Sequence, residues 1–354
     1  MGDRRITVAV IGVGGNVSQG IVKALRQSPL SPRVVGLDLT PDQAGLYWCD
    51  AGWVVPRAED PAFLPRLAHA CRAERVDIIL TGCEPVLDAL ADQRQAVESA
   101  TGAMFPVPPP ALYWRARDKW TLLEWLREAG LPTARAVLSE DRDGLESLRN
   151  AQGFPLLAKP RRGGGSRGLF LVQDDDDLAY IARKRDYVVE EMLRSVGGEY
   201  TVGCFSNRSG DLQEMIVLRR ELHLGTTYRA WVDDHPEVRA MVEALCRVLR
   251  VPGPCNFQLL MTERGPICFE VNPRFSGSTA IRATLGFNDV DALIRERLLG
   301  ETPHLPRIRQ GVVLRYWHEM YPDPARRKAL AENGRFGDAV GLDPGTTGPE
   351  DAAS

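Results

Sequence analysis

The chain has 354 residues, enough for two or three domains with a substantial core. Lys and Arg number 44 and Asp and Glu 47, and the resulting net charge of −3 offers no basic surface for nucleic acid or for an anionic membrane. The seven cysteines have no CxxC spacing and an odd count, which argues against a disulfide framework and favours buried thiols in the cytoplasm.

The first hundred residues alternate strand and helix patterns. Apolar runs at residues 6–11, 34–39, 53–56 and 76–81 predict strands, and residues 21–26, 63–73 and 86–97 predict helices. This alternation predicts a parallel sheet flanked by helices, a Rossmann-like α/β domain over residues 1–110 that ends in a proline-rich linker. Because the first apolar run stops at Gly12 and no run approaches ~20 residues, we expect neither a signal peptide nor a membrane span.

A glycine-rich turn follows the first predicted strand. Gly12, Gly14 and Gly15 lie between the strand and a helix, and Asp38 ends the next strand. The pattern resembles a dinucleotide fingerprint, in which the acid binds a ribose hydroxyl, but Val17 stands where the third glycine belongs. Tight turns need glycine for backbone reasons alone. We therefore favour a structural or substrate-side role over dinucleotide binding by a dehydrogenase.

After the linker, the pattern changes to a mixture of short strands and helices. Strands are predicted at residues 134–138, 155–159, 169–172, 187–191, 200–206 and 214–218, and helices at residues 119–128, 144–151 and 237–249. This mixture predicts an α+β region after the linker. The sequence after residue 335 is rich in Gly, Asp, Pro and Ala, and we assign residues 321–354 to a partly disordered tail.

A second glycine-rich loop joins two predicted strands at residues 160–168. Lys159 precedes the loop, and Gly164, Gly165 and Ser166 lie within it. A Walker loop passes from a strand into a helix and ends in GK[ST], which this loop does not. A hairpin with free backbone N–H groups, a hydroxyl and basic side chains can close over phosphates, and Lys159 can reach a phosphate oxygen. The alternative is an exposed hairpin with surface arginines.

The strongest pattern is a hairpin predicted over residues 255–271. If the hairpin is centred on Arg264, Gln258 faces Glu270 and Asn256 faces Asn272, so that all four lie on one face. Polar side chains on so apolar a hairpin are costly unless they bind something. Glu, Gln and Asn offer hard oxygens, which suit Mg²⁺ beside nucleotide phosphates.

The other face of this hairpin is predicted to be apolar, with Phe257, Leu259, Phe269 and Val271 pointing into a core. Arg274 follows the second strand, where a guanidinium can stabilise charge on a transferring phosphoryl group.

Five stretches together resemble the ATP-grasp superfamily, and in particular one ATP-grasp half of the carbamoyl phosphate synthase large subunit. They are residues 118–119 with 130–133, residues 159–168, residues 189–193 with 199–200, residues 256–258 and residues 269–278. They span residues 111–300 in the order found in that family. The resemblance implies a two-lobed ATP-grasp domain over residues 111–320, with a lid lobe at about 133–190. The N-terminal α/β unit is similar to the domain that precedes ATP-grasp folds and helps to build the acceptor side of their active site.

The resemblance implies roles for single residues. The phosphates of ATP would be bound by Lys119, Lys159, Gly164, Gly165 and Ser166, the adenine by Glu190, Glu191 and Leu193, and the ribose by Glu199. The metal, Mg²⁺ or else Mn²⁺, would be held by Gln258, Glu270 and Asn272. Arg274 and Lys159 would be the catalytic residues.

The activity implied is that of an ATP-dependent carboxylate–amine ligase, which forms an acyl phosphate and then an amide or peptide bond on an amino acid or small carboxylic acid. The chain has one ATP-grasp unit and no glutaminase region, which argues against carbamoyl phosphate synthesis by this chain alone. A carboxyphosphate-forming carboxylase and a non-catalytic nucleotide-binding module remain as alternatives. We expect small-molecule substrates and leave a homodimer open.

The substrate side of the site is defined less sharply. Glu84 follows the fourth predicted strand, at the strand end where open α/β sheets bind ligands, and either binds a substrate amine or is a helix N-terminal acid. Arg282 and Arg315 either anchor a substrate carboxylate or form ion pairs.

Overall fold

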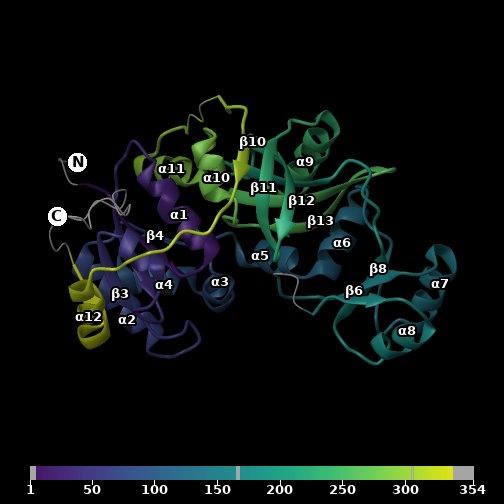
Figure 1. The fold of residues 1–354 in the computed structure, drawn as a ribbon, viewed down its shortest axis with the longest axis horizontal. Helices are drawn as coiled ribbons and strands as arrows, with labels where there is room; N and C mark the ends of the chain where they lie inside the picture. The colour runs from purple at the N-terminus through teal and green to yellow at the C-terminus, as the bar shows by residue number, and fades with distance from the viewer. Residues whose placement is uncertain (1–4, 165–167, 304, 306, 338–354) are drawn as a thin grey trace. The chain divides into compact units, whose positions relative to one another are not determined.

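The computed structural model describes residues 5–164, 168–303, 305 and 307–337 (Figure 1). The chain divides into two compact units. Unit 1 contains Met1–Val107, Arg274–Ile308 and Tyr316–Ser354, and unit 2 contains Pro108–Pro273 and Arg309–Arg315. Both units are mixed α/β structures, as the sequence predicted.

Unit 1 is built on a five-stranded sheet with the order β15-β3-β2-β1-β4. The strands are β1 (Thr7–Ile11), β2 (Arg33–Asp38), β3 (Ala51–Val54), β4 (Ile78–Thr81) and β15 (Arg335–Phe336). The four strands that come first in the chain are parallel, and β15 pairs antiparallel with β3. β1 and β4 are buried along their whole length, as expected for parallel strands covered on both faces.

The helical elements of unit 1 come from three separate parts of the chain. They are α1 (Asn16–Arg26), η1 (Ala44–Trp48), α2 (Phe63–Glu74), α3 (Glu84–Leu90), η2 (Ala91–Gln93), α4 (Arg94–Thr101), α10 (Thr279–Thr284), α11 (Asp289–Ile294), η3 (Arg295–Leu299) and α12 (Pro324–Asn333). The helix predicted at residues 86–97 is divided among α3, η2 and α4.

Helices α10 and α11 pack against α1. Gly20 of α1 lets the backbone of Ala280 approach to 3.5 Å from the position that a Cβ atom would occupy, and the Asn288 side chain donates to the Ala24 carbonyl at 2.9 Å. The sequence placed these residues in the domain 111–320. The structure instead groups residues 274–308 with the N-terminal strands, because their apolar faces are buried against α1.

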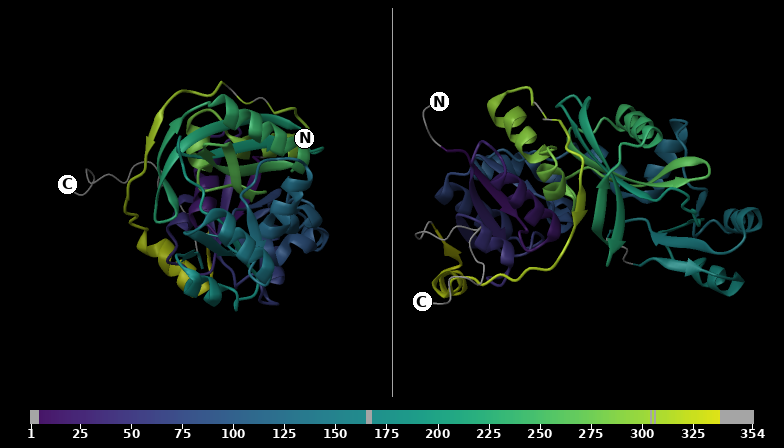
Figure 2. Two further views of the ribbon diagram at one scale, coloured as in Figure 1. Left: turned by 90° about the vertical axis from the view of Figure 1, so that its right-hand side faces the viewer. Right: turned by 45° about the horizontal axis from the view of Figure 1, so that its top comes forward.

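The C-terminal segment completes the sheet of unit 1. Phe336 in β15 stacks on Tyr47 with ring centroids 6.1 Å apart, and Arg335 lies over the ring of Trp53. Figure 2 shows α12, drawn in yellow, beside the N-terminal sheet, in agreement with the packing of α12 on β3. Residues 324–336 are therefore ordered, although they fall within the tail that the sequence predicted to be partly disordered.

Unit 2 contains two antiparallel sheets. The smaller sheet has the order β5-β8-β6-β7 and carries α7 and α8. Its elements are β5 (Ala136–Leu138), α7 (Arg142–Gln152), β6 (Leu156–Pro160), β7 (Phe170–Val172), α8 (Asp175–Ile181) and β8 (Tyr187–Glu191). Two helices precede it, α5 (Pro110–Arg117) and α6 (Lys119–Glu128).

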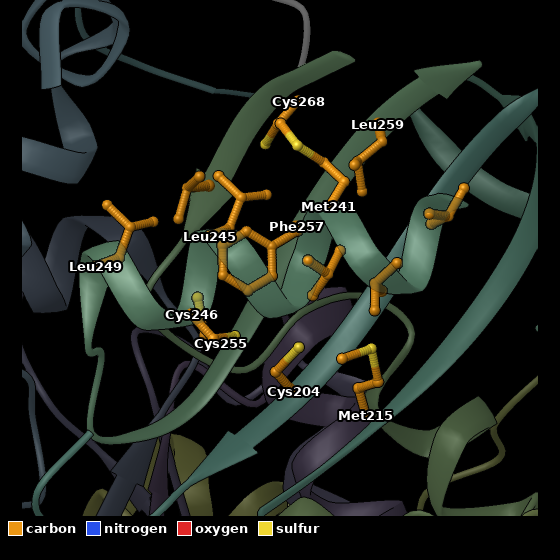
Figure 3. Packing of buried hydrophobic residues seen from close by; sticks show 14 of the residues in the cluster. Cys204, Met215, Met241, Leu245, Cys246, Leu249, Cys255, Phe257, Leu259 and Cys268 are labelled. Atoms are coloured by element: carbon orange, nitrogen blue, oxygen red, sulfur yellow. The ribbon is translucent and has the colours of Figure 1, made fainter. Parts of the chain in front are cut away.

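The larger sheet has the order β13-β12-β9-β10-β11-β14. Its elements are β9 (Glu199–Ser206), β10 (Leu212–His223), β11 (Thr226–Val232), α9 (Pro236–Leu249), β12 (Gly253–Thr262), β13 (Gly265–Asn272) and β14 (Val312–Leu314). One face of this sheet packs on α9, where Leu245 lies beside Phe257 (Figure 3). Because that face is filled by the core, the polar side chains of the same strands lie on the other face.

Candidate functional site

The hairpin formed by β12 and β13 has the predicted register. Gln258 pairs with Glu270 and Asn256 pairs with Asn272. Phe257 and Val271, which alternate with them, are 1% and 3% exposed and belong to the core beneath α9. The polar face that the sequence predicted is therefore confirmed.

The apolar face differs from the prediction at one residue. The register shifts between Gln258 and Leu259, so that Leu259 pairs with Cys268 and Phe269 becomes the extra residue of a β-bulge. Cys268 and Leu259 are buried in the core cluster, whereas Phe269 is half-buried. The prediction that Phe269 fills this core was wrong, because alternation does not continue across a bulge.

Glu270 and Asn272 form a connected pair of oxygen donors. The Asn272 side-chain Nδ2 donates to Glu270 Oε1 at 2.8 Å, which fixes the orientation of both side chains. Within the described part of the chain, no group of three or more His, Cys, Asp or Glu side chains could hold a metal. A metal on this hairpin would therefore rest on one carboxylate and amide oxygens, a donor set that suits Mg²⁺ when phosphates complete the coordination.

Lys159 lies at the end of β6 and points into a buried ion pair. Its Nζ is 2.7 Å from Glu190 Oε2, and the two side chains are 7% and 5% exposed. Burial raises the pKa of the Cys268 thiol to about 12, and among the smaller influences on it are the charges of Glu270 and Lys159.

Arg220 is a central residue that the sequence did not single out. Its Nε and Nη2 donate to Glu199 Oε1 at 2.9 and 2.5 Å, and its Nη2 also donates to Gln258 Oε1 at 2.6 Å. The Arg220 side chain is 8% exposed. One guanidinium thus joins the predicted ribose ligand to a predicted metal ligand.

The start of the glycine-rich loop is fastened to the beginning of α6. Lys119 Nζ donates to the carbonyls of Pro160 and Gly163 at 3.0 and 2.9 Å. Asp118 caps α6 and accepts two hydrogen bonds from Arg161, at 3.1 and 2.8 Å. Gly164 ends this described stretch, and Gly165 and Ser166 lie outside the described residues.

The predicted adenine segment follows the smaller sheet. Glu191 Oε1 accepts from the backbone N–H of Arg135 at 2.8 Å and from Arg264 Nη2 at 2.5 Å. Leu193 is half-buried just beyond the end of β8. Because the side chains of Glu190 and Glu191 are both engaged by cations, an adenine ring would meet the backbone of this segment and Leu193.

Two predicted residues come together in unit 1. Arg274 donates to the Glu84 carboxylate and also, at 2.8 Å, to the carbonyl of Phe275. Asp38, the candidate ribose ligand of a dinucleotide site, instead accepts from the backbone N–H groups of Gly14 at 2.6 Å and Leu39 at 2.7 Å. Asp38 is 8% exposed, so its role is to close the glycine turn.

The two remaining arginines lie elsewhere. Arg282 is fully buried and donates to Asp289 at 2.6 Å and to Thr279 at 3.1 Å. It is therefore a core ion pair and does not anchor a substrate, because a fully buried guanidinium has no surface to offer. Arg315 donates to Thr226 at 2.9 Å, and burial lowers the pKa of its guanidinium.

The arrangement of a Rossmann-like sheet, a small antiparallel lobe and a large sheet with a polar hairpin face is that of the ATP-grasp fold. Two family models agree with it. Residues 7–104 match the PylC-like N-terminal domain, and residues 183–320 match the family described as ATP-grasp in the biosynthetic pathway with Ter operon. These matches confirm the resemblance to the ATP-grasp superfamily.

Curated relatives share parts of the chain. An uncharacterized protein of Sinorhizobium fredii is 26% identical over 57% of this chain and 46% of its own length. A D-alanine–D-alanine ligase of Halorhodospira halophila is 28% identical over 37% of this chain and 45% of its own length. The carbamoyl phosphate synthase large chain of Streptomyces avermitilis is 26% identical over 51% of this chain and 18% of its own length. The chain therefore spans less than half the length of each of these relatives.

Solved structures share the fold. An ADP complex of N5-carboxyaminoimidazole ribonucleotide synthetase has a TM-score of 0.67 at 18% identity, covering 88% of this chain and 81% of the other. The biotin carboxylase domain of Hydrogenobacter thermophilus 2-oxoglutarate carboxylase, solved with MgADP and bicarbonate, has a TM-score of 0.67 at 16% identity. The match covers 88% of this chain and 74% of that chain. L-amino acid ligase from Bacillus licheniformis has a TM-score of 0.63 at 18% identity, and the match covers 83% of this chain and 74% of that chain.

Proposed function

We propose that this protein is an ATP-dependent carboxylate–amine ligase that acts on an amino acid or another small carboxylic acid. The observation that carries the proposal is the polar face of the β12–β13 hairpin, where Glu270 and Asn272 stand over an apolar core. Polar groups placed so close to a core are expensive unless they serve a ligand. In the smaller sheet of the same unit, Lys159 forms a buried ion pair with Glu190.

In this proposal the chain binds ATP between the two sheets of unit 2. Lys159 and Lys119 contact the phosphates, with Gly164, Gly165 and Ser166 of the loop beside them, and the segment from Glu190 to Leu193 lies along the adenine. Mg²⁺, or Mn²⁺ as an alternative, fits Glu270, Asn272 and Gln258 as oxygen donors. When bound, the metal neutralises phosphate charge.

The proposed reaction has two displacements. A carboxylate oxygen attacks the γ-phosphorus and ADP leaves, which gives an acyl phosphate. The amine then attacks the acyl carbon, phosphate leaves and an amide forms with loss of a proton. Arg274 is proposed to steady the negative charge of the phosphoryl group.

Glu84 and Arg274 are proposed to bind the acceptor substrate. Glu84 begins α3 after the carboxyl end of β4, the position at which parallel sheets bind ligands. Its ion pair with Arg274 places opposite charges side by side, and a substrate with an ammonium and a carboxylate could exchange partners with both.

A carboxylase that forms carboxyphosphate from bicarbonate is a second candidate. The similarity to the N5-carboxyaminoimidazole ribonucleotide synthetase and to the biotin carboxylase domain favours it, although at 18% and 16% identity this similarity concerns the fold. The deciding experiment measures phosphate release from MgATP against a panel of amino acids and against bicarbonate. Release with an amino acid supports the ligase, release with bicarbonate alone supports the carboxylase, and ATP binding without turnover supports a non-catalytic module.

Two further expectations remain proposals. Among the described residues, none of the seven cysteines forms a disulfide, and the cytoplasmic setting stays a proposal. No helix among the described residues is long and apolar enough to cross a membrane. A homodimer is left to measurement of the molecular mass in solution.

A further inference from the structure

Arg220 lies at the centre of the proposed nucleotide site. It stands on β10, directly opposite Glu199 of β9, and Gln258 of β12 pairs with Thr201 two residues further along β9. Adjacent and diagonal positions on one face of a sheet bring long side chains into contact. The Arg220 guanidinium therefore reaches both Glu199 and Gln258 without any loop having to move.

The hydrogen bonds of Arg220 to Glu199 leave one carboxylate oxygen of Glu199 available. Both bonds to Glu199 use Oε1, so that Oε2 can accept from another donor. The bond to Gln258 also goes to its oxygen, at 2.6 Å. Arg220 Nη1 further approaches Thr227 Oγ1 at 3.5 Å. A planar guanidinium that contacts three side chains restricts the Glu199 carboxylate and the Gln258 amide more than a single ammonium group would.

We propose that Arg220 is a positioning residue for the nucleotide, which sets Glu199 to read the ribose hydroxyls and holds Gln258 beside the phosphate-bound metal. The inference rests on the proposed function, because it assumes that a nucleotide binds on this face. A carboxylate held in one orientation loses less conformational freedom when it accepts a ribose hydroxyl, so fixation by Arg220 should sharpen the discrimination between ribose and deoxyribose.

The test uses the full chain and measures the dissociation constants of MgADP and Mg-2′-deoxyADP by isothermal titration calorimetry. We expect the wild-type protein to bind MgADP about tenfold more tightly than the deoxy form, as one hydrogen bond to a charged group allows. Arg220→Met should bring this ratio to within about threefold of one. The matched control is Arg219→Met, on the same strand, since the Arg219 side chain is 46% exposed and pairs with Asp233, and its ratio should equal that of the wild type.

The outcomes separate the two proposals. A wild-type protein that binds no MgADP overturns the proposed function itself. If Arg220→Met binds MgADP and keeps the wild-type preference over Mg-2′-deoxyADP, the positioning role alone is overturned. A larger preference for MgADP in this variant would also overturn that role, because it would show that Arg220 keeps Glu199 from the ribose.

If Arg220→Met does not fold, Arg220→Lys decides. A single ammonium can hold Glu199 but cannot fork to Gln258, so the ratio should persist while the affinity for MgADP falls several-fold. Wild-type affinity and ratio in Arg220→Lys would overturn the proposal.

Discussion

Glu270 provides the negative charge on the polar face of the hairpin. It accepts from Asn272 and lies opposite Gln258, and the apolar residues that stabilise the hairpin are on the other face. The residues proposed to bind the metal and the residues that form the core thus lie on different faces of the same two strands. A substitution on the polar face can test the chemistry with little effect on the fold.

Glu270→Gln keeps the shape of the side chain and removes its charge. If a metal held by Glu270 carries the phosphoryl transfer, turnover should fall by roughly 10²-fold or more. The measurement is ATP-dependent phosphate release by a variant whose melting temperature matches that of the wild type. Glu263→Gln, at the exposed turn of the same hairpin, is the control and should keep normal turnover. Near wild-type turnover in Glu270→Gln would remove the strongest support for the ligase.

The buried pair of Lys159 and Glu190 makes a separate prediction about stability. Removing one partner leaves an uncompensated buried charge, which costs about 3–5 kcal/mol in comparable cases. Lys159→Met alone should therefore lower the free energy of unfolding more than Lys159→Met combined with Glu190→Leu. Urea denaturation of the wild type, both single variants and the double variant gives the four free energies of unfolding, from which the coupling energy between Lys159 and Glu190 is calculated. Additive single effects would mean that the pair is not coupled in the folded protein.

At the scale of single residues, the sequence predicted the polar face of the hairpin, but it did not predict that Arg220 binds Gln258 on this face. Arg220 lies beyond residue 218, where the charged run of residues 219–221 ended the apolar pattern of the predicted strand. Arg282 was ambiguous for a different reason. Its partner Asp289 begins the next helix, and only the packing of α10 and α11 on α1 buries the pair.

At the scale of elements, the beginning of α6 and the end of β6 are held together by Asp118 and Arg161. The Asp118 carboxylate accepts from the backbone at the start of α6 and from Arg161. Burial works to raise the pKa of Asp118, but the hydrogen bonds from Arg161 and the helix N-terminus outweigh it and hold the pKa below 3.8. This contact fixes where the glycine-rich loop starts.

The sign of this shift gives a pH prediction. Because the pKa is lower in the folded than in the unfolded chain, the ionised Asp118 stabilises the fold above pH 3.8, and the contribution is lost as the pH falls through the folded value. The difference in melting temperature between wild type and Asp118→Asn should be constant from about pH 5 to 7 and shrink below pH 4. Thermal unfolding at a series of pH values measures it. A difference that does not change with pH would show that the charge of Asp118 is unimportant.

The pairing of two strands could be predicted where a short turn joins them and so determines which residues face each other. The β12–β13 hairpin could be derived from its centre at Arg264, because cross-strand partners follow from the turn by counting. The bulge at Phe269 could not, since an extra residue leaves no mark in an apolar run. The strand β11 (Thr226–Val232) was missed, because Tyr228, Arg229 and Trp231 give no clean alternation of apolar and polar residues.

At the scale of the whole molecule, a bound nucleotide should raise the melting temperature by mass action. MgATP at 100 times its dissociation constant would stabilise the protein by about 2.7 kcal/mol, whereas NAD should have no effect, because Asp38 is already occupied by backbone N–H groups. Differential scanning fluorimetry with each nucleotide checks this. A shift with NAD and none with MgATP would contradict the assignment.

The order of elements along the chain predicted an α/β sheet followed by an α+β region, and both are present. The discontinuity of unit 1 was not predictable, because it depends on helices and a strand that follow the second unit in the sequence. Local pattern identifies an element, but only tertiary packing decides which sheet that element covers.

This discontinuity bears on how the protein is made. The ribosome releases the strands β1 to β4 first. Helix α10, which packs on α1, is translated after residues 108–273 of unit 2, and β15, which pairs with the edge of β3, is translated after all of unit 2. Until then β3 presents an unpaired edge, a template for association with other chains. Domains usually finish folding in the order of their synthesis. Here the first domain to emerge is the last to be completed, so the edge of β3 stays without its β15 partner until residues 335–336 are translated.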